Sequence, residues 1–149
     1  RPWMAGFEAG DGRRHRWEDH RVRGGLSLMS SRVKVRIRLH GVGEAVGELI
    51  KVLAPLTIEA LLRRLPIEGR AHLVDGGVAI LIGLGRGEEK AVRDVEAGAM
   101  AYWPMEDSLC LYHSPARPYT PVNRVGRIIE GLELLKRVRS GCRIRIERA

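Results

Sequence analysis

The chain has 149 residues, of which 44% are apolar and 30% charged, and its 26 Lys and Arg outnumber 18 Asp and Glu to give a formal net charge of +8. This length suits one domain with a core of its own, and no apolar run approaches the roughly 18 residues that a membrane-spanning helix needs. The two cysteines show no Cys-x-x-Cys spacing, which speaks against a disulfide scaffold and predicts free thiols in a cytoplasmic protein without a membrane partner.

Residues 1–28 are predicted to form a basic tail ahead of a domain over residues 29–149. The tail has six Arg and no hydrophobic periodicity, whereas alternation of apolar and polar residues begins at Val33. Large apolar side chains of the kind that anchor a segment on a folded surface also occur in it. They are Trp3, Phe7 and Trp17. Two states therefore stay open for the tail, disorder and docking on the domain or on a neighbouring subunit.

The domain is predicted to begin with two strands and a helix. Apolar residues alternate with basic ones from Val33 to Leu39, which is the period of a half-buried strand. A glycine turn then leads into a second strand over residues 44–53. The helix begins at Thr57, a suitable N-cap, and ends before Pro66. Its apolar face is predicted to consist of Ile58, Leu61, Leu62 and Leu65.

The remaining elements are predicted to be strands, with one more helix near the end. The strands cover residues 71–74, 78–82, 99–103, 108–113, 125–129 and 142–146. Gly83 to Gly87 lack the Gly-x-Gly-x-x-Gly spacing of a phosphate loop and are predicted to form a flexible hairpin. Leu132, Leu135 and Val138 share one face of the second short helix. The pattern predicts a mainly β fold, one closed barrel or sandwich with two short helices.

The sequence contains no motif for metal or covalent chemistry. None of the five histidines is spaced with Cys or carboxylates as in a zinc site, and no serine lies in a Gly-x-Ser-x-Gly turn. We therefore expect no metal and no cofactor. The basic residues are interleaved with acids such as Glu88, Asp94 and Glu130, and aromatics are only 5% of the chain, which disfavours direct nucleic-acid binding.

Two stretches carry a family resemblance. Val125-Gly126-Arg127-Ile128 followed by Glu130-Gly131 and a short amphipathic helix resembles the C-terminal part of cyclophilins, which closes a small β-barrel. Ala101-Tyr102-Trp103-Pro104 and Pro121–Ile128 resemble segments of a compact cyclophilin-like family of archaea and bacteria with no assigned function. The resemblance extends over about residues 32–148 and implies a closed cyclophilin-like β-barrel capped by two helices.

The resemblance also implies a ligand groove. In cyclophilins, the segments similar to residues 98–101 and 110–113 face a groove that holds a prolyl peptide. It implies that Met100, Ala101, Tyr112 and His113 line a similar groove here, with Trp103 and Tyr119 at the rim. Asn123, after the proline-rich loop, is a further candidate. The alternative is that Trp103 and Tyr112 only fill the barrel.

The arginine that cyclophilins aim at the prolyl amide has no clear counterpart. Their Phe-His-Arg run and the Trp-Leu-Asp-Gly loop are missing, and Arg70-Ala71-His72 only partly matches the first. Arg70 and Arg124 are the candidates for the missing cation. We therefore predict a binding module for a small molecule or an extended peptide. The alternatives are a weak peptidyl-prolyl cis-trans isomerase and a structural protein that is homo-oligomeric or associated with nucleic acid.

The barrel topology raises a problem of charge. If the first and last core strands are neighbours, Arg36 and Arg38 share an outer face with Arg143 and Arg145, and like charges on adjacent strands destabilise a sheet. Either these side chains splay into solvent, or acids neutralise them. Candidate neutralising groups are Glu18 and Asp19 of the tail, a second subunit, or a polyanion.

Overall fold

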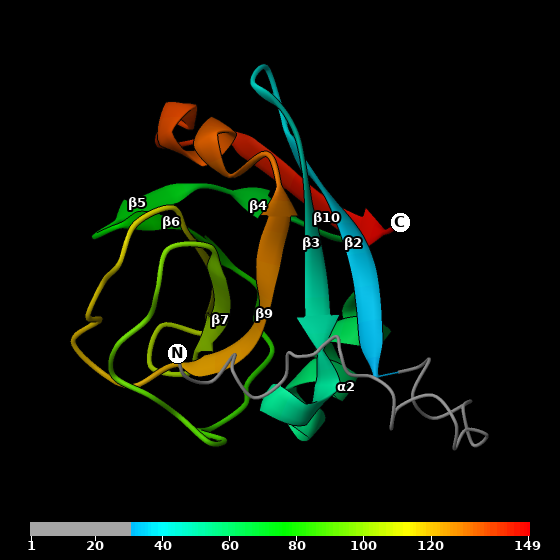
Figure 1. The fold of residues 1–149 in the computed structure, drawn as a ribbon, viewed down its shortest axis with the longest axis vertical. Coiled ribbons are helices and arrows are strands. Elements are labelled where there is room, and N and C mark those ends of the chain that lie inside the picture. Colours follow the sequence, from blue (N-terminus) through cyan, green and yellow to red (C-terminus); the bar gives the residue numbers. More distant parts are fainter. Residues whose placement is uncertain (1–30) are drawn as a thin grey trace, which may run out of the picture. The chain divides into compact units, whose positions relative to one another are not determined.

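The computed structural model describes residues 31–149, so the predicted tail over residues 1–28 lies outside the described residues. Nine strands form one sheet in the order β4-β10-β2-β3-β9-β7-β8-β6-β5, which curls into a nearly closed barrel (Figure 1). The strands are β2 (Arg32–Leu39), β3 (Gly43–Ile50), β4 (Ile67–Arg70), β5 (His72–Val74), β6 (Gly77–Leu81), β7 (Ala99–Trp103), β8 (Ser108–Tyr112), β9 (Asn123–Glu130) and β10 (Arg143–Arg148). The predicted mainly β barrel is confirmed.

The first and last core strands are neighbours, as predicted. β10 pairs antiparallel with β2, where Ile146 faces Ile37, and pairs with β4 on its other side. The far ends of the sheet approach each other at Gly69 of β4, because a Cβ built there would stand 3.3 Å from Cβ of Ile80 in β6. A glycine thus allows the close contact that nearly closes the barrel.

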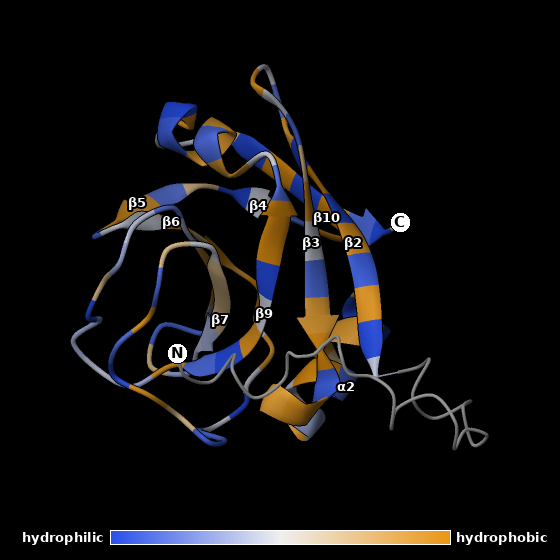
Figure 2. Ribbon diagram, in the orientation of Figure 1, coloured by the Kyte–Doolittle hydropathy of each residue, from blue (hydrophilic) through white to orange (hydrophobic). Residues whose placement is uncertain are grey.

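Alternating side chains separate the inside of the barrel from its outside. On β2, Val35 and Ile37 are fully buried, whereas Lys34 before them and Arg38 after them are exposed. Figure 2 shows this alternation as bands of opposite hydropathy along β2. The buried face of β2 belongs to one large cluster of apolar residues that fills the barrel.

Helical elements lie at both ends of the barrel (Figure 1). They are η3 (Lys51–Leu53), α2 (Pro55–Arg64) and η4 (Leu132–Arg137). The second predicted helix, η4, is a 310 helix that starts after Gly131 at φ 81°, and its Leu135 is buried. None of the described helices is long and apolar enough to cross a bilayer.

The start of α2 differs from the prediction. Pro55 is the first helical residue and Ala54 the N-cap, and Ala54 offers no side-chain hydrogen bond. Thr57 is therefore not the cap. Glu89, far away in sequence, fills that role: its carboxylate accepts hydrogen bonds from the amides of Leu56 (2.9 Å) and Thr57 (2.8 Å).

Two further predictions need correction. The second strand ends at Ile50, because η3 turns the chain into α2, and β4 was missed because a four-residue strand with a central glycine has no clear alternation. The Gly83–Gly87 segment is not a hairpin. β6 pairs with β5 and β8 rather than with β7, and residues 82–98 form a long loop without a strand of their own.

Three arginines on the outer face of β2 and β10 form ion pairs with glutamates of the barrel itself. Glu147 lies 2.9 Å from Arg36, 3.5 Å from Arg38 and 2.8 Å from Arg145. Glu44 and Glu68 add further ion pairs to these arginines. The expectation of splayed side chains is wrong for these three arginines, and no acid of the tail is needed. Glu18 and Asp19 lie outside the described residues.

Candidate functional site

A second apolar cluster lies on the outer face of β6, β7 and β8. Because successive side chains of a strand point to opposite faces, Met100 and Tyr102 of β7 enter the barrel core, while Ala101 and Trp103 join the outer cluster. On β8, Tyr112 also belongs to the outer cluster. The two clusters are therefore the two faces of one sheet.

Two long loops cover this outer cluster. Residues 82–98 and 113–122 are held together by two isolated antiparallel bridges, in which Val92 pairs with Val122 and Val95 with Ala116. Val122 is fully buried. The loops are thus fixed to one another over the sheet, and the space left between loop and sheet can serve as a site.

A groove of about 370 Å³ remains between the β5–β6 turn and the second loop. Its lining is mostly apolar and aromatic, with one carboxylate and one guanidinium. The lining residues are Val74, Asp75, Trp103, Tyr112, Arg117, Pro118 and Tyr119. The turn after β5, the ends of β7 and β8, and the loop that follows β8 therefore meet at this groove.

Trp103 and Tyr119 form its aromatic corner. Their ring centroids are 5.1 Å apart and the ring planes cross at 65°, an edge-to-face arrangement. The Trp103 indole N–H donates to Oγ1 of Thr120 at 2.7 Å, and the Tyr119 hydroxyl donates to the Glu106 carboxylate. Tyr119 is 60% exposed, so its ring is held in place and still open to solvent.

The two charged residues that line the groove differ: Arg117 forms an ion pair, whereas Asp75 is exposed. Nη1 of Arg117 lies 2.8 Å from both carboxylate oxygens of Asp94, which neutralises the guanidinium. Asp75 is exposed in the turn between β5 and β6. Burial raises the pKa of Tyr112, and the nearby Cys110 and Asp75 raise it further, so this phenol is neutral at physiological pH.

Of the predicted groove residues, Trp103, Tyr112 and Tyr119 do line the groove. Ala101 is fully buried beneath it in the outer cluster. Met100 does not line it, because it is buried on the opposite face of the sheet. The alternation of β7 contained this signal: residues 100 and 103 point to opposite faces of one strand.

His113 and Asn123 also lie away from the groove lining. Nδ1 of His113 is 2.8 Å from Oγ of Ser114. The pKa of this histidine is lowered, mainly by burial and in addition by the positive charge of Lys136 in η4. Asn123 is fully buried. Its Oδ1 accepts from the Glu89 amide (2.8 Å), and its Nδ2 donates to Thr57 (3.2 Å). Asn123 thus joins the long loop to α2.

Neither candidate cation lines the groove. Arg70 is exposed on β4 and donates from Nη1 to the carbonyl of Gly141 at 3.1 Å. Arg124 is half-buried on β9 opposite Ala101, and burial lowers the pKa of its guanidinium although Glu96 opposes this. The sequence reasoning missed Arg117, the one guanidinium among the described lining residues, because nothing marked it within the proline-rich loop.

The glycine segment of the long loop wraps a carboxylate. Asp107, at φ 50°, accepts hydrogen bonds from the amides of Leu84 (2.8 Å) and Gly85 (3.0 Å) and from the Tyr102 hydroxyl (2.5 Å). Burial alone would raise the pKa of Asp107, but these bonds outweigh it and lower the pKa. Burial and the same carboxylate raise the pKa of Tyr102 to about 12. The segment is thus an anion-binding nest that the chain's own Asp107 fills.

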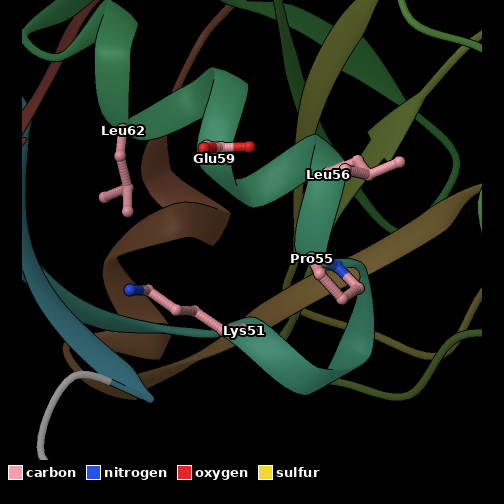
Figure 3. A pocket seen from close by; sticks show the side chains of 5 residues that line it. All are labelled: Lys51, Pro55, Leu56, Glu59 and Leu62. Carbon is pink, nitrogen blue, oxygen red and sulfur yellow. The ribbon is translucent and has the colours of Figure 1, made fainter. Parts of the chain in front are cut away.

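A second hollow of about 280 Å³ lies beside the first turns of α2. Its lining residues are Lys51, Pro55, Leu56, Glu59 and Leu62, and Figure 3 shows Lys51 extending from η3 on the same side as Leu62. It contains none of the predicted site residues. Among residues 31–149, no group of three His, Cys, Asp or Glu side chains is placed to hold a metal ion.

Comparisons with known proteins agree with this architecture. Residues 33–147 match the family model described as cyclophilin-like, and the chain therefore belongs to the cyclophilin-like family. The solution structure of the hypothetical protein AF2241 from Archaeoglobus fulgidus is similar, with 31% identity and a TM-score of 0.69 over 80% of this chain and 96% of that one. McbB, solved in complex with tryptophan, shares the fold at 18% identity and a TM-score of 0.65, over 76% of this chain and 44% of its own. No match was found among proteins of curated function.

Proposed function

We propose that this protein is a binding module that holds a small molecule or an extended peptide in the groove beside Trp103, Tyr112 and Tyr119. The observation that carries the proposal is the groove's volume of about 370 Å³ together with its aromatic lining. Ligand pockets have volumes of about 300 to 1,000 Å³ and are lined mainly by apolar and aromatic side chains. The groove has both properties.

The shape favours a flat ring or a proline ring as the part of the ligand that enters. Such a ring fits beside two aromatic planes that cross at 65°, where it buries apolar area and stacks or packs edge to face. The fold neighbour McbB has been solved in complex with tryptophan. Tryptophan and proline-containing peptides are therefore the first probes to use.

The test is an NMR titration of the full chain that follows the indole N–H signal of Trp103. Loss of one signal in Trp103→Phe assigns it among the three tryptophans of the chain. Tryptophan or a prolyl peptide is expected to shift this signal, and Tyr119→Ala to weaken the binding. Leu81→Ala is the matched control, because Leu81 is 62% exposed and does not line the groove. If neither class of probe moves the signal, the proposal fails.

Weak prolyl isomerisation is the second candidate, and Arg117 is the observation that favours it. A cation at the prolyl amide would weaken the C–N double-bond character that creates a barrier of about 20 kcal/mol. Arg117 lines the groove, although Asp94 engages it. A protease-coupled assay with prolyl peptides tests this role: Arg117→Ala should abolish any activity, whereas Arg70→Ala and Arg124→Ala test the two cations predicted from sequence.

A structural role with nucleic acid has one supporting observation. Arg143 of β10 faces Arg70 of β4 directly, a like-charge pair on the outer face. A gel shift that weakens steeply with salt, and weakens further in Arg143→Ala, is the expected result for this role. Complete absence of a shift at low salt would remove it.

A further inference from the structure

We infer that the groove selects ligands that carry a protonated amine beside an aromatic or apolar body. This inference rests on the proposed function, because it specifies the ligand class of the same groove. Three features of the site carry it: the concentration of aromatic rings, an exposed carboxylate in a fixed turn, and the neutralisation of the single lining guanidinium.

The aromatic residues of the described chain gather at this groove. Residues 31–149 contain four Trp, Tyr or Phe side chains, and three of them line it: Trp103, Tyr112 and Tyr119. Trp103 and Tyr119 pack edge to face at 65°, and Tyr119 is the exposed ring of this pair. Aromatic faces attract cations through the ring quadrupole, and cages of such rings recognise quaternary and protonated amines.

Asp75 supplies the negative charge. It lines the groove, and its carboxylate makes no hydrogen bond or ion pair within the described part of the chain. The turn that carries it is clamped, because the Gly76 carbonyl accepts from the amides of His113 (2.9 Å) and Ser114 (3.1 Å). A Cβ at Gly76 would stand 2.9 Å from Cβ of Ala116. The backbone of the turn is therefore fixed beside the loop without a ligand, and Asp75 extends from this fixed turn.

Arg117 does not cancel this charge. Its Nη1 lies 2.8 Å from both oxygens of Asp94, so the two side chains together are neutral. Among the lining residues and Asp94, Asp75 then leaves a net charge of minus one, in a chain whose formal net charge is +8. The positive net charge of the chain repels a cationic ligand, whereas the carboxylate at the groove attracts it, so cations should bind selectively at the groove.

The experiment compares ligands that share one body and differ in charge. Tryptamine, tryptophol and indole-3-acetate carry an ammonium, a hydroxyl and a carboxylate on the same ring system, and each is titrated into the full chain at pH 7. We expect tryptamine to bind about tenfold more tightly than tryptophol, a typical sum for one carboxylate contact and one cation–π contact. A lysine-containing peptide and its acetyl-lysine counterpart form a second pair, which distinguishes a peptide ammonium from that of a free amine.

Asp75→Asn should remove the preference for tryptamine, whereas Glu88→Gln should keep it. The second variant removes the same charge from an exposed residue that does not line this groove, so it controls for net charge. Salt offers a measurement without mutation, because the preference of the unchanged chain should shrink as salt rises. Equal binding of tryptamine and tryptophol, or tighter binding of indole-3-acetate, overturns the inference and leaves the proposed function intact. If no indole binds and no prolyl peptide does, the proposed function itself fails.

Discussion

Replacing Glu89 is expected to weaken both the first turn of α2 and the attachment of the long loop. The Glu89 carboxylate accepts three hydrogen bonds, from the amides of Leu56 (2.9 Å) and Thr57 (2.8 Å) and from the Thr57 hydroxyl (2.7 Å). The first amides of a helix have no partner within the helix, and its positive N-terminal end favours an anion. The Glu89 side chain therefore supplies the N-terminal hydrogen bonds that the N-cap residue Ala54 cannot make.

The size of the effect follows from these contacts. Loss of an N-cap costs about 0.5 to 2 kcal/mol, and a hydrogen bond to a charged group contributes about 1.5 to 3 kcal/mol when well shielded. Glu89 is only partly buried, which argues for the lower values. We expect Glu89→Ala to lower the free energy of unfolding by about 2 kcal/mol and Glu89→Gln by about 1 kcal/mol, with a fall in Tm of about 4 °C per kcal/mol.

Urea and thermal unfolding monitored by circular dichroism measure these values, with Glu88→Ala as the control. Glu88 is exposed and its side chain is not part of the cap, so its loss should change stability by less than about 0.5 kcal/mol. Equal values for the two alanine variants would refute the reasoning, because the cap would then contribute nothing.

The pH dependence gives a second check. Burial by itself would raise the pKa of Glu89, but the hydrogen bonds from Leu56 and Thr57, with the charge of Lys90, lower it below 4.5. A lowered folded-state pKa means that the stabilisation is fully present above the unfolded pKa and is lost as pH falls through the folded value. The difference in stability between the unchanged chain and Glu89→Gln should therefore stay constant from pH 7 to about 5.5 and shrink below about 4.5.

Three further substitutions, and one control, test other parts of the barrel. Asp107→Ala should destabilise the protein by about 2 kcal/mol and expose the Gly83–Gly87 segment to proteolysis, because three hydrogen bonds to this partly buried carboxylate are lost; an unchanged cleavage rate would contradict its role. Glu147→Gln should lower Tm at low salt and less so at high salt, since three arginines lose their shared carboxylate; a salt-independent loss would argue against the ion pairs. Gly126→Ala should cost about 3 kcal/mol or more, because its methyl would overlap the backbone carbonyl of Glu48. Gly87→Ala, where a Cβ meets nothing within 4 Å, should be close to neutral by the same urea unfolding.

Much of the fold could be predicted from local patterns. The alternation from Val33 to Leu39 predicts β2, and the run Ala99–Trp103 coincides with β7. The resemblance in Pro121–Ile128 led to the family that the comparison confirms. Each of these signals lies within a few consecutive residues, where the period of the strand and its turn residues are decided.

The site could be predicted only in part. The resemblance to cyclophilins implied Trp103, Tyr112 and Tyr119, which line the groove, but also Met100 and His113, which do not. Asp75 and Arg117 were missed because a turn aspartate and a loop arginine have ordinary local explanations. They become groove residues only because the β5–β6 turn and the second loop meet over β7 and β8.

The sequence by itself determined which residues face the core on β2, where apolar and basic residues alternate with a period of two. Only the tertiary structure decided which distant groups become partners: Glu89 with the start of α2, Asp107 with the glycine segment, and Glu147 with three arginines. The physical reason is that a hydrogen bond or an ion pair depends on a distance of a few ångströms. The number of residues between two groups says little about the distance between them, because only the folded barrel brings such groups together.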